Sequence, residues 1–300
     1  MKRITEERNA LTMHIDTLST KDVLTLINGQ DQQVPKVISQ PEIIAAITQV
    51  VDAIVACFKQ GGRLFYIGAG TSGRLGVLDA AECVPTFGTS PEMVQGLIAG
   101  GQVAMTEAVE GAEDSEAGGQ ADLKAKQLAA NDFVLGLAAS GTTPYVIGGL
   151  DYAREVGAGT GALSCNQHAL ISQHAEFAIE APVGPEVVTG STRMKSGTAE
   201  KLILNMISTT AMIKLGKVYG NLMVDVKPTN KKLVDRAQRI IQDATGVDRA
   251  TAVDFYQKSQ SQPKIAIVMI NGNCSLTEAE QALAATDGFI AAALEYLRQH

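Results

Sequence analysis

The chain of 300 residues contains no tryptophan, and aromatic residues make up only 4% of it. Proteins that bind single-stranded nucleic acid without sequence preference stack the bases on aromatic side chains, so the composition disfavours this class. The formal net charge of −7 also disfavours non-specific binding to nucleic acid or to anionic membranes. An anionic small molecule is still an acceptable ligand, provided that local donors overcome the unfavourable global charge.

Cysteine is scarce, and no apolar run approaches the length of a membrane span. The four cysteines are scattered without a Cys-x-x-Cys pair, which argues against a disulfide framework or a zinc site. The first ten residues, MKRITEERNA, lack the apolar core of a signal peptide. The sequence therefore predicts a cytoplasmic protein with no bound metal and no membrane contact.

Hydrophobic residues make up 45% of the chain and charged residues 19%, which is enough apolar material for a packed core. Residues 1–40 are polar, with a short helical pattern near Leu24–Ile27. From Pro41 to Phe58 apolar residues recur at helical spacing, and Gly61 and Gly62 supply a stop. We expect a long amphipathic helix there, followed by the first strand.

Short apolar runs then alternate with helical patterns, one of which covers 144–156. The runs expected to form strands are 63–67, 94–99, 133–139, 161–165 and 177–179. This alternation predicts a doubly wound three-layer α/β/α sandwich with a parallel sheet. Its ligand site should lie beyond the carboxyl ends of the strands.

The character of the chain changes near its C-terminal quarter. A long helical stretch runs from Ser191 to Lys217, and residues 230–300 have the pattern of several short helices. The run 265–270, IAIVMI, fits either a strand or a buried helix. We expect an N-terminal segment over 1–40, a parallel α/β domain over 41–225 and a small helical domain over 226–300.

The first expected strand leads into Gly68-Ala-Gly-Thr-Ser-Gly-Arg74, which matches the pattern G-x-G-x-x-G. A dinucleotide site would also need an acidic residue at the end of the second strand, but that strand runs into Ile98-Ala-Gly-Gly101. Gly70, Thr71 and Ser72 suit a phosphate better, because backbone N–H groups and hydroxyls at a helix start donate to anions. No cofactor is expected.

A second loop, Ala138-Ala-Ser-Gly-Thr-Thr-Pro144, also lies between a strand and a helix. Ser140, Gly141, Thr142 and Thr143 could be ordinary turn and cap residues. Two such loops at equivalent places on one sheet edge could instead converge on one phosphate. Taken together, the two loops favour anion binding.

Positive charge stands at the start of the long helix, in Val188-Thr-Gly-Ser-Thr-Arg-Met-Lys-Ser-Gly197. Arg193 and Lys195 are unfavourable for the helix dipole there, so a compensating anion is expected unless both side chains simply point to solvent. Two acidic stretches, 79–85 and 110–116, could likewise be solvated surface or could carry chemistry.

Five segments occur together and in order, and they resemble the N-acetylmuramic acid 6-phosphate etherases. The segments are GAGTSGRLGVLDAAEC (68–83), AVEGAEDS (108–115), AASGTTPY (138–145), EVVTGSTRMKSGTA (186–199) and NLMVDV (221–226). The resemblance covers nearly the whole chain, including the TEERN start. It implies a sugar isomerase domain with a small helical C-terminal domain, a homodimer, and a relationship to the glucokinase regulatory proteins.

The resemblance also implies a reaction and its residues. N-acetylmuramic acid 6-phosphate and water would give N-acetylglucosamine 6-phosphate and D-lactate, in the recycling of cell-wall amino sugars. The catalytic glutamates of the family correspond to Glu82 and Glu113. The chain departs from the family pattern at Thr142, where the family has arginine, and at Val84, where it has proline. The first change puts a substrate or dimer contact in doubt, and neither touches the glutamates.

The chemistry needs a base at C2 of the open-chain sugar and an acid at the ether oxygen. We assign Glu113 as the base and Glu82 as the acid, so we expect burial or a nearby carboxylate to raise the pKa of Glu82. One sheet offers one wall of loops, which predicts an active site shared between subunits. A sugar-phosphate isomerase and a non-catalytic sugar-phosphate-binding regulator are the alternatives.

Overall fold

The computed structural model describes residues 3–228 and 230–300. Its internal contacts define two compact units, and each is described by itself. The first contains the chain up to Ala81 together with Pro91–Ser208, and the second contains Glu82–Ser90 together with Thr209–His300. The expected domain boundaries near residues 41 and 226 stay a prediction.

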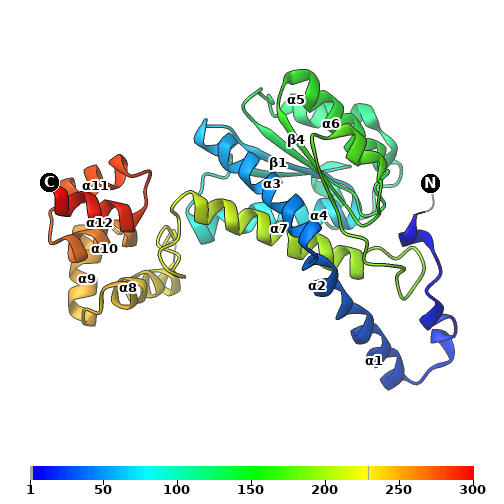
Figure 1. The fold of residues 1–300 in the computed structure, drawn as a ribbon, viewed down its shortest axis with the longest axis horizontal. Helices are drawn as coiled ribbons and strands as arrows, with labels where there is room; N and C mark the ends of the chain where they lie inside the picture. Colours follow the sequence, from blue (N-terminus) through cyan, green and yellow to red (C-terminus); the bar gives the residue numbers. More distant parts are fainter. Residues whose placement is uncertain (1–2, 229) are drawn as a thin grey trace. The chain divides into compact units, whose positions relative to one another are not determined.

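The first unit is built on a five-stranded sheet with the strand order β2-β1-β3-β4-β5 (Figure 1). Every neighbouring pair of strands in it is parallel. The strands are β1 (Leu64–Gly68), β2 (Val94–Ile98), β3 (Phe133–Leu137), β4 (Gly159–Ser164) and β5 (Phe177–Glu180). All five coincide with the runs expected from the sequence to within two residues, which confirms the parallel α/β fold.

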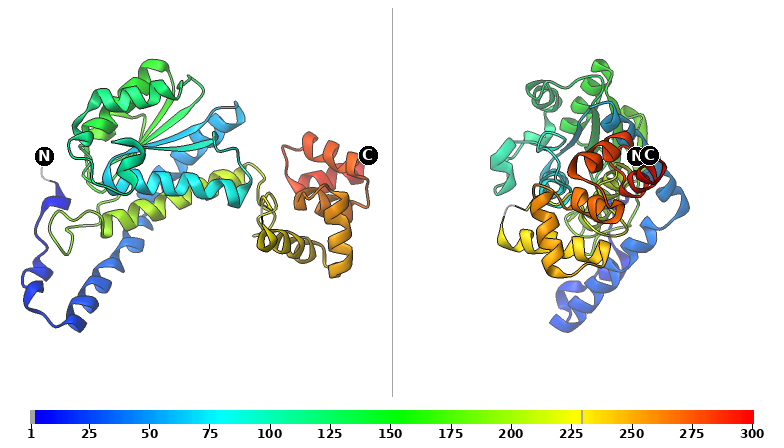
Figure 2. Two further views of the ribbon diagram at one scale, coloured as in Figure 1. Left: turned by 180° about the vertical axis from the view of Figure 1, so that it is seen from behind. Right: turned by 90° about the vertical axis from the view of Figure 1, so that its left-hand side faces the viewer.

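Helices cover both faces of this sheet. Helices α5 and α6 lie on one face, and α3, α4 and α7 lie on the other (Figures 1 and 2). Their bounds are α3 (Pro41–Lys59), α4 (Gly70–Phe87), α5 (Glu116–Ala125), α6 (Pro144–Val156) and α7 (Lys195–Lys214). Because helices cover both faces, β1 and β3 are buried along their whole length. Strands buried in this way need apolar side chains on both faces.

Among the described residues, α3 is the one helix that is long and apolar enough to cross a membrane, which corrects the expectation that no apolar run approaches that length. Its apolar face, which includes Ile43, Val50 and Ile54, is buried inside the unit. Helix α3 also packs against β1, β3, β4 and β5. It is therefore a core helix that packs against the sheet.

Side chains of β1 alternate between the two helical layers. A Cβ atom at Gly76 of α4 would lie 2.9 Å from the Cβ of Tyr66, and one at Gly149 of α6 would lie 2.4 Å from Ile67. The absence of side chains at these two glycines lets both helices approach the sheet closely. Both crossover helices are thereby placed directly against β1, the strand that leads into the first glycine-rich segment.

An N-terminal arm precedes α3. It contains three 3₁₀ turns, η1 (Ile4–Glu6), η2 (Ala10–Thr12) and η3 (Ile15–Thr17), and the helices α1 (Thr20–Asp31) and α2 (Gln33–Ile38). Thr5 is fully buried, and the side chain of Asn9 donates to the backbone oxygen of Pro185. The arm is therefore anchored to the first unit at Thr5 and Asn9.

The second unit is helical. It contains the end of α4, the end of α7, and α8 (Lys231–Thr245), α9 (Arg249–Lys258), α10 (Pro263–Gly272), α11 (Leu276–Ala285) and α12 (Ile290–Gln299). The ambiguous run 265–270 lies in α10, where Pro263 occupies the first turn and Asn273 ends the helix with a φ of 48°. Five consecutive residues of this run are buried, which explains why its periodicity was uninformative.

Candidate functional site

Three loops meet at the carboxyl ends of β2, β1 and β3. Strands β1 and β3 are neighbours in register, with Gly68 opposite Leu137, so the segments that follow them start side by side. The chain leaves β1 toward β2 on one side and leaves β3 toward β4 on the other. Such a reversal of strand order is the place where parallel α/β proteins bind their ligands.

A cavity of about 510 Å³ opens at this position. It has the size of a small-molecule site. Its walls come from both glycine-rich segments, the N-terminal arm and the loop that follows β2. The lining residues are Arg3, Glu6, Ala69, Gly70, Thr71, Ser72, Glu113, Asp114, Ala138, Ala139, Ser140, Thr142, Thr143, Pro144 and Thr192. Both segments therefore line one space, and the phosphate that we expect between them stays a prediction.

The first segment is mostly helical rather than a loop. Helix α4 begins at Gly70, which has a φ of 52°, so Thr71 and Ser72 lie in its first turn. Ser72 is buried, and its hydroxyl lies 2.6 Å from Oε1 of Glu200 on α7. The start of α4 therefore faces the cavity with backbone N–H groups, while the hydroxyl of Ser72 is engaged behind it.

Glu200 is fully buried, and its Oε2 has no hydrogen-bond partner among the described residues. Burial raises the pKa of this carboxyl group to about 7, against the opposing effect of the hydrogen bond from Ser72. A neutral carboxylic acid leaves less charge unsolvated than a carboxylate with one unpaired oxygen. When protonated, Glu200 can donate to Ser72 and release the hydroxyl proton of Ser72 for another acceptor.

The second segment forms the opposite wall. Gly141 has a φ of 74°, and a Cβ atom there would lie 2.5 Å from the Cβ of Ala169, so only glycine fits. Thr143 is the N-cap residue of α6, yet its side chain makes no capping hydrogen bond within the described chain. The first turn of this 13-residue helix is consequently open toward the cavity, with the hydroxyls of Ser140, Thr142 and Thr143 around it.

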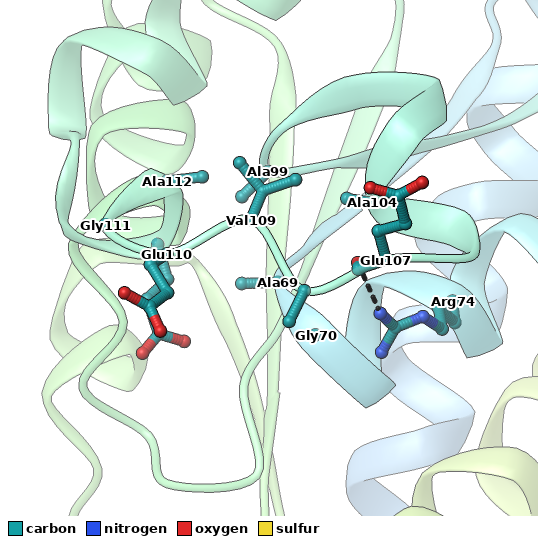
Figure 3. Close-up of a pocket in the computed structure, with 12 residues that line it drawn as sticks. Ala69, Gly70, Arg74, Ala99, Ala104, Glu107, Val109, Glu110, Gly111 and Ala112 are labelled. Atoms are coloured by element: carbon teal, nitrogen blue, oxygen red, sulfur yellow. Dashed lines mark hydrogen bonds between the residues drawn. The ribbon is translucent and has the colours of Figure 1, made fainter.

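Glu113 lies in the loop after β2, in the short turn η5 (Ala112–Asp114). It is exposed, and it lines both the large cavity and an adjoining one of about 260 Å³. The smaller cavity is shared between the start of α4 and residues 107–113 of the loop (Figure 3). Glu113 is therefore positioned at the boundary of the two spaces.

Arg74 ties this loop to α4. Its guanidinium donates to the backbone oxygens of Met105 and Glu107, each at 3.1 Å. Figure 3 shows the guanidinium reaching the Glu107 backbone while the Glu107 carboxylate points elsewhere. Because Glu113 follows six residues later, Arg74 helps to hold the segment that presents it.

Glu82 stands on α4, twelve residues after Gly70, and its contacts place it in the second unit. At 1.5 Å per residue, twelve residues advance a helix by roughly 18 Å. Glu82 is not among the residues that line either cavity. Of the burial or nearby carboxylate that we expected for this side chain, burial is not found in the single chain, where Glu82 is exposed.

The start of α7 holds an anion of the protein itself. The buried Glu186 carboxylate accepts from the backbone N–H groups of Lys195 and Ser196 and from the hydroxyl of Ser196, each at 2.9 Å. Lys195 is buried too, and its Nζ donates to Gln30. Burial lowers the pKa of Lys195, while Glu186 and Asp31 oppose that shift. The compensating anion expected from the sequence is thus present as Glu186.

Arg193 is exposed, and neither it nor Lys195 is among the cavity residues, whereas Thr192 is. A role for Arg193 and Lys195 in substrate binding stays a prediction. The helix also begins at Lys195 rather than at the expected Ser191. The contacts of Glu186 with residues 195 and 196 explain this later start, because they satisfy the first free N–H groups of the helix.

Sequence reasoning missed three residues at this site, namely Arg3, Asn166 and Glu200. Asn166 exchanges hydrogen bonds with Thr5 and donates to the backbone oxygens of Ala139 and Ser140. It therefore joins the arm to the second segment. Each of the three acts through a partner more than 120 residues away, and no local pattern signals such a pairing.

Comparisons with known proteins show which family the sequence resembles. Residues 46–154 match the model of the glucokinase regulatory protein N-terminal SIS domain. The chain is 59% identical over 293 residues to an N-acetylmuramic acid 6-phosphate etherase of Exiguobacterium, covering 98% of this chain and 99% of that protein. It is 61% identical over 291 residues to N-acetylmuramic acid 6-phosphate etherase 2 of Lactiplantibacillus plantarum, covering 96% and 97%.

Solved structures support the fold alone. A phosphoheptose isomerase from Francisella tularensis aligns with a TM-score of 0.51 at 16% identity, covering 65% of this chain and 100% of that one. A putative phosphosugar isomerase from Bacteroides fragilis aligns with a TM-score of 0.51 at 16% identity, covering 68% and 95%. At such identities the similarity shows a shared parallel α/β architecture.

Proposed function

The chain belongs to the family of N-acetylmuramic acid 6-phosphate etherases, and from this premise we propose how its site carries out that reaction. The substrate would be N-acetylmuramic acid 6-phosphate. The enzyme is a carbon–oxygen lyase that releases D-lactate and leaves N-acetylglucosamine 6-phosphate. This reaction belongs to the recycling of amino sugars from peptidoglycan.

The observation that carries the proposal is the cavity where two helix starts face one space. The first turns of α4 and α6 both line it, and α6 lacks a side-chain cap within the described chain. A helix start carries the equivalent of about half a positive charge and offers free N–H donors, so two of them suit a phosphate dianion. We propose that the phosphate lies between Gly70–Ser72 and Ser140–Thr143, with the sugar extending toward Glu113.

The ether is cleaved through the aldehyde form of the sugar. In the open chain, the proton on C2 is acidic because it lies next to the C1 carbonyl, and the lactyl oxygen is attached to C3. Removal of that proton by a base forms the C2–C3 double bond, and the C3–O bond breaks as the lactyl oxygen takes a proton from an acid. Water then adds to C3 and a proton returns to C2, which gives the product without any change in oxidation state.

We assign Glu113 as the base at C2 and Glu82 as the acid at the ether oxygen. Glu113 suits the role of base because it is exposed at the boundary of two cavities, where a bound sugar can reach its carboxyl group. Each such proton transfer contributes about 10²–10⁴ to the rate. The remote phosphate holds the sugar so that C2 meets the carboxylate.

The distance along α4 between Gly70 and Glu82 bears on which subunit supplies the catalytic acid. Glu82 stands roughly 18 Å along the helix from Gly70, where the helix begins at the cavity. We therefore propose a homodimer in which Glu82 of one subunit completes the cavity of the other. Symmetric two-fold dimers supply such a contribution twice, once to each site.

The experiment is to incubate the protein with N-acetylmuramic acid 6-phosphate and to measure D-lactate. Release from the phosphorylated sugar, and at most weak release from unphosphorylated N-acetylmuramic acid, supports the proposal. In H₂¹⁸O the new C3 hydroxyl should contain ¹⁸O while the lactate should not, because C3–O is the bond that breaks. Binding of the sugar phosphate without release of lactate would refute the activity and favour a regulator.

A further inference from the structure

The charges around the large cavity are unfavourable for the phosphate that it is proposed to hold. Glu6, Glu113 and Asp114 line it with carboxylates. Against these three, Arg3 is the single cationic side chain among the lining residues of the described chain. A bound phosphate ester adds about −1.5 to −2 charges at neutral pH, so the cavity needs whatever positive charge it can recruit.

The N-terminal arm brings Arg3 to this position through buried contacts. Two residues after Arg3, the fully buried Thr5 exchanges two hydrogen bonds with Asn166. Asn166 in turn donates to the backbone oxygens of Ala139 and Ser140, in the segment that forms the cavity wall. The backbone beside Arg3 is consequently fixed to the same segment that offers the hydroxyls.

The side chain of Arg3 already points at that segment. Its Nη1 donates to Oγ1 of Thr142 at 3.2 Å, across 139 residues of sequence. A guanidinium has five N–H donors in one plane, so the bond to Thr142 leaves four of them available. Such a planar fork matches two oxygens of a phosphate group better than any other side chain does.

We propose that Arg3 is a substrate-binding residue, whose guanidinium contacts the phosphate of the sugar phosphate from the side of the N-terminal arm. The proposal rests on the proposed function and adds a residue to it. It assigns to the arm a direct part in the site, with Thr142 orienting the guanidinium. The second segment has no cationic side chain of its own, and Arg3 then supplies one from the N-terminal arm.

The first test compares Arg3→Ala with Arg154→Ala in the D-lactate assay. Arg154 is exposed in the last turn of α6 and is not among the cavity residues, so its loss changes the net charge equally. A hydrogen-bonded contact between charged groups predicts a KM for Arg3→Ala raised roughly 10- to 100-fold. The kcat should change less than about threefold, because Arg3 would bind the phosphate and not the reacting carbons.

The second test is rescue from the neighbouring position. Because Thr142 Oγ1 lies 3.2 Å from the guanidinium, an arginine at 142 can reach the same space. Arg3→Ala combined with Thr142→Arg should therefore bring the raised KM most of the way back to the wild-type value. Arg3→Lys should retain only part of the wild-type affinity, since a point charge replaces the planar fork of the guanidinium. A purely structural role for Arg3 would not be rescued in this way.

The outcomes separate the two proposals. A wild-type protein that releases no D-lactate refutes the proposed function. A wild-type protein that releases it, with Arg3→Ala and Arg154→Ala equal in KM within about twofold, overturns the role of Arg3 alone. A loss of kcat with an unchanged KM in Arg3→Ala would also overturn it, because the effect would then fall on the reacting centre.

Discussion

Helices α6 and α7 start in the same unit, and they differ in what faces their first turns. The first turn of α7 is closed by the buried Glu186 carboxylate, which accepts three hydrogen bonds there. The first turn of α6 has no side-chain cap within the described chain and faces a cavity of about 510 Å³. A helix start whose N–H groups are already satisfied serves folding, whereas one left open toward a cavity is available to a ligand.

The contrast also explains two outcomes of the sequence analysis. Ser, Thr and Gly follow the strands in a recognisable pattern, so the segments at Gly70–Ser72 and Ser140–Thr143 could be found without coordinates. The positive residues before α7 suggested an anion, which is present, but it is a side chain of the protein rather than a ligand. A sequence cannot distinguish the two cases, because Glu186 and Lys195 are brought together by a turn with no regular pattern.

Regular elements were predicted well where local chemistry decides them. Helix α6 has the expected bounds because Pro144 starts it and Gly157, with a φ of 85°, ends it. The buried run of α10 could not be assigned, since a segment that is apolar on all sides has no periodicity. Contacts across the fold, such as Arg3 with Thr142 and Ser72 with Glu200, depend on tertiary structure and leave no local signal.

The largest expected effect tests whether the reaction takes place in the cavity that the open first turn of α6 faces. Glu113→Gln removes the proposed base without changing the size of the side chain, and it should lower kcat roughly 10²–10⁴-fold. Glu116→Gln is the control, because Glu116 is exposed and lines neither cavity, so its kcat should change less than about threefold. Equal activities of the two variants in the D-lactate assay would exclude Glu113 as the base.

The second prediction concerns the carboxyl group behind the start of α4. Glu200 has a pKa raised to about 7 by burial, above its ordinary value of 4.5. Between these pH values the unfolded chain has released the proton while the folded chain retains it. The folded state therefore loses stability as the pH rises from about 4.5 to about 7, by on the order of 3 kcal/mol.

Glu200→Gln should abolish that loss, since the amide does not titrate. Urea unfolding at several pH values from 4 to 8 measures the free energy of unfolding of both proteins. The difference between variant and wild type should grow in favour of the variant as the pH rises. Parallel pH profiles of the two proteins would show that Glu200 has an ordinary pKa in the folded state.

The third prediction concerns the closed start of α7. Glu186→Gln leaves an amide NH₂ facing N–H donors, so it should lower the free energy of unfolding by roughly 2 kcal/mol. Its KM should stay within about twofold of wild type, because Glu186 is not among the cavity residues. Glu176→Gln, the same change at an exposed position, should cost less than about 0.5 kcal/mol. A large rise in the KM of Glu186→Gln with unchanged stability would contradict this, because the start of α7 would then serve binding rather than folding.

The smallest effect is expected at the open start itself. Thr143→Val keeps the shape of the N-cap residue and removes its hydroxyl, which caps nothing within the described chain. The stability should therefore not fall by the usual ~1 kcal/mol of a lost cap. The KM should instead rise roughly 5- to 10-fold, as for one lost hydrogen bond to the substrate. Thermal unfolding and the lactate assay together decide between capping and binding.

The central claim is that the phosphate of the substrate occupies the space between the starts of α4 and α6. The most direct measurement is a crystal structure of the protein with the product N-acetylglucosamine 6-phosphate. We expect the phosphate within hydrogen-bonding distance of the Thr143 hydroxyl and of backbone N–H groups in both first turns. A phosphate found instead beside Arg193 and Lys195 at the start of α7, or outside the cavity altogether, would contradict the account.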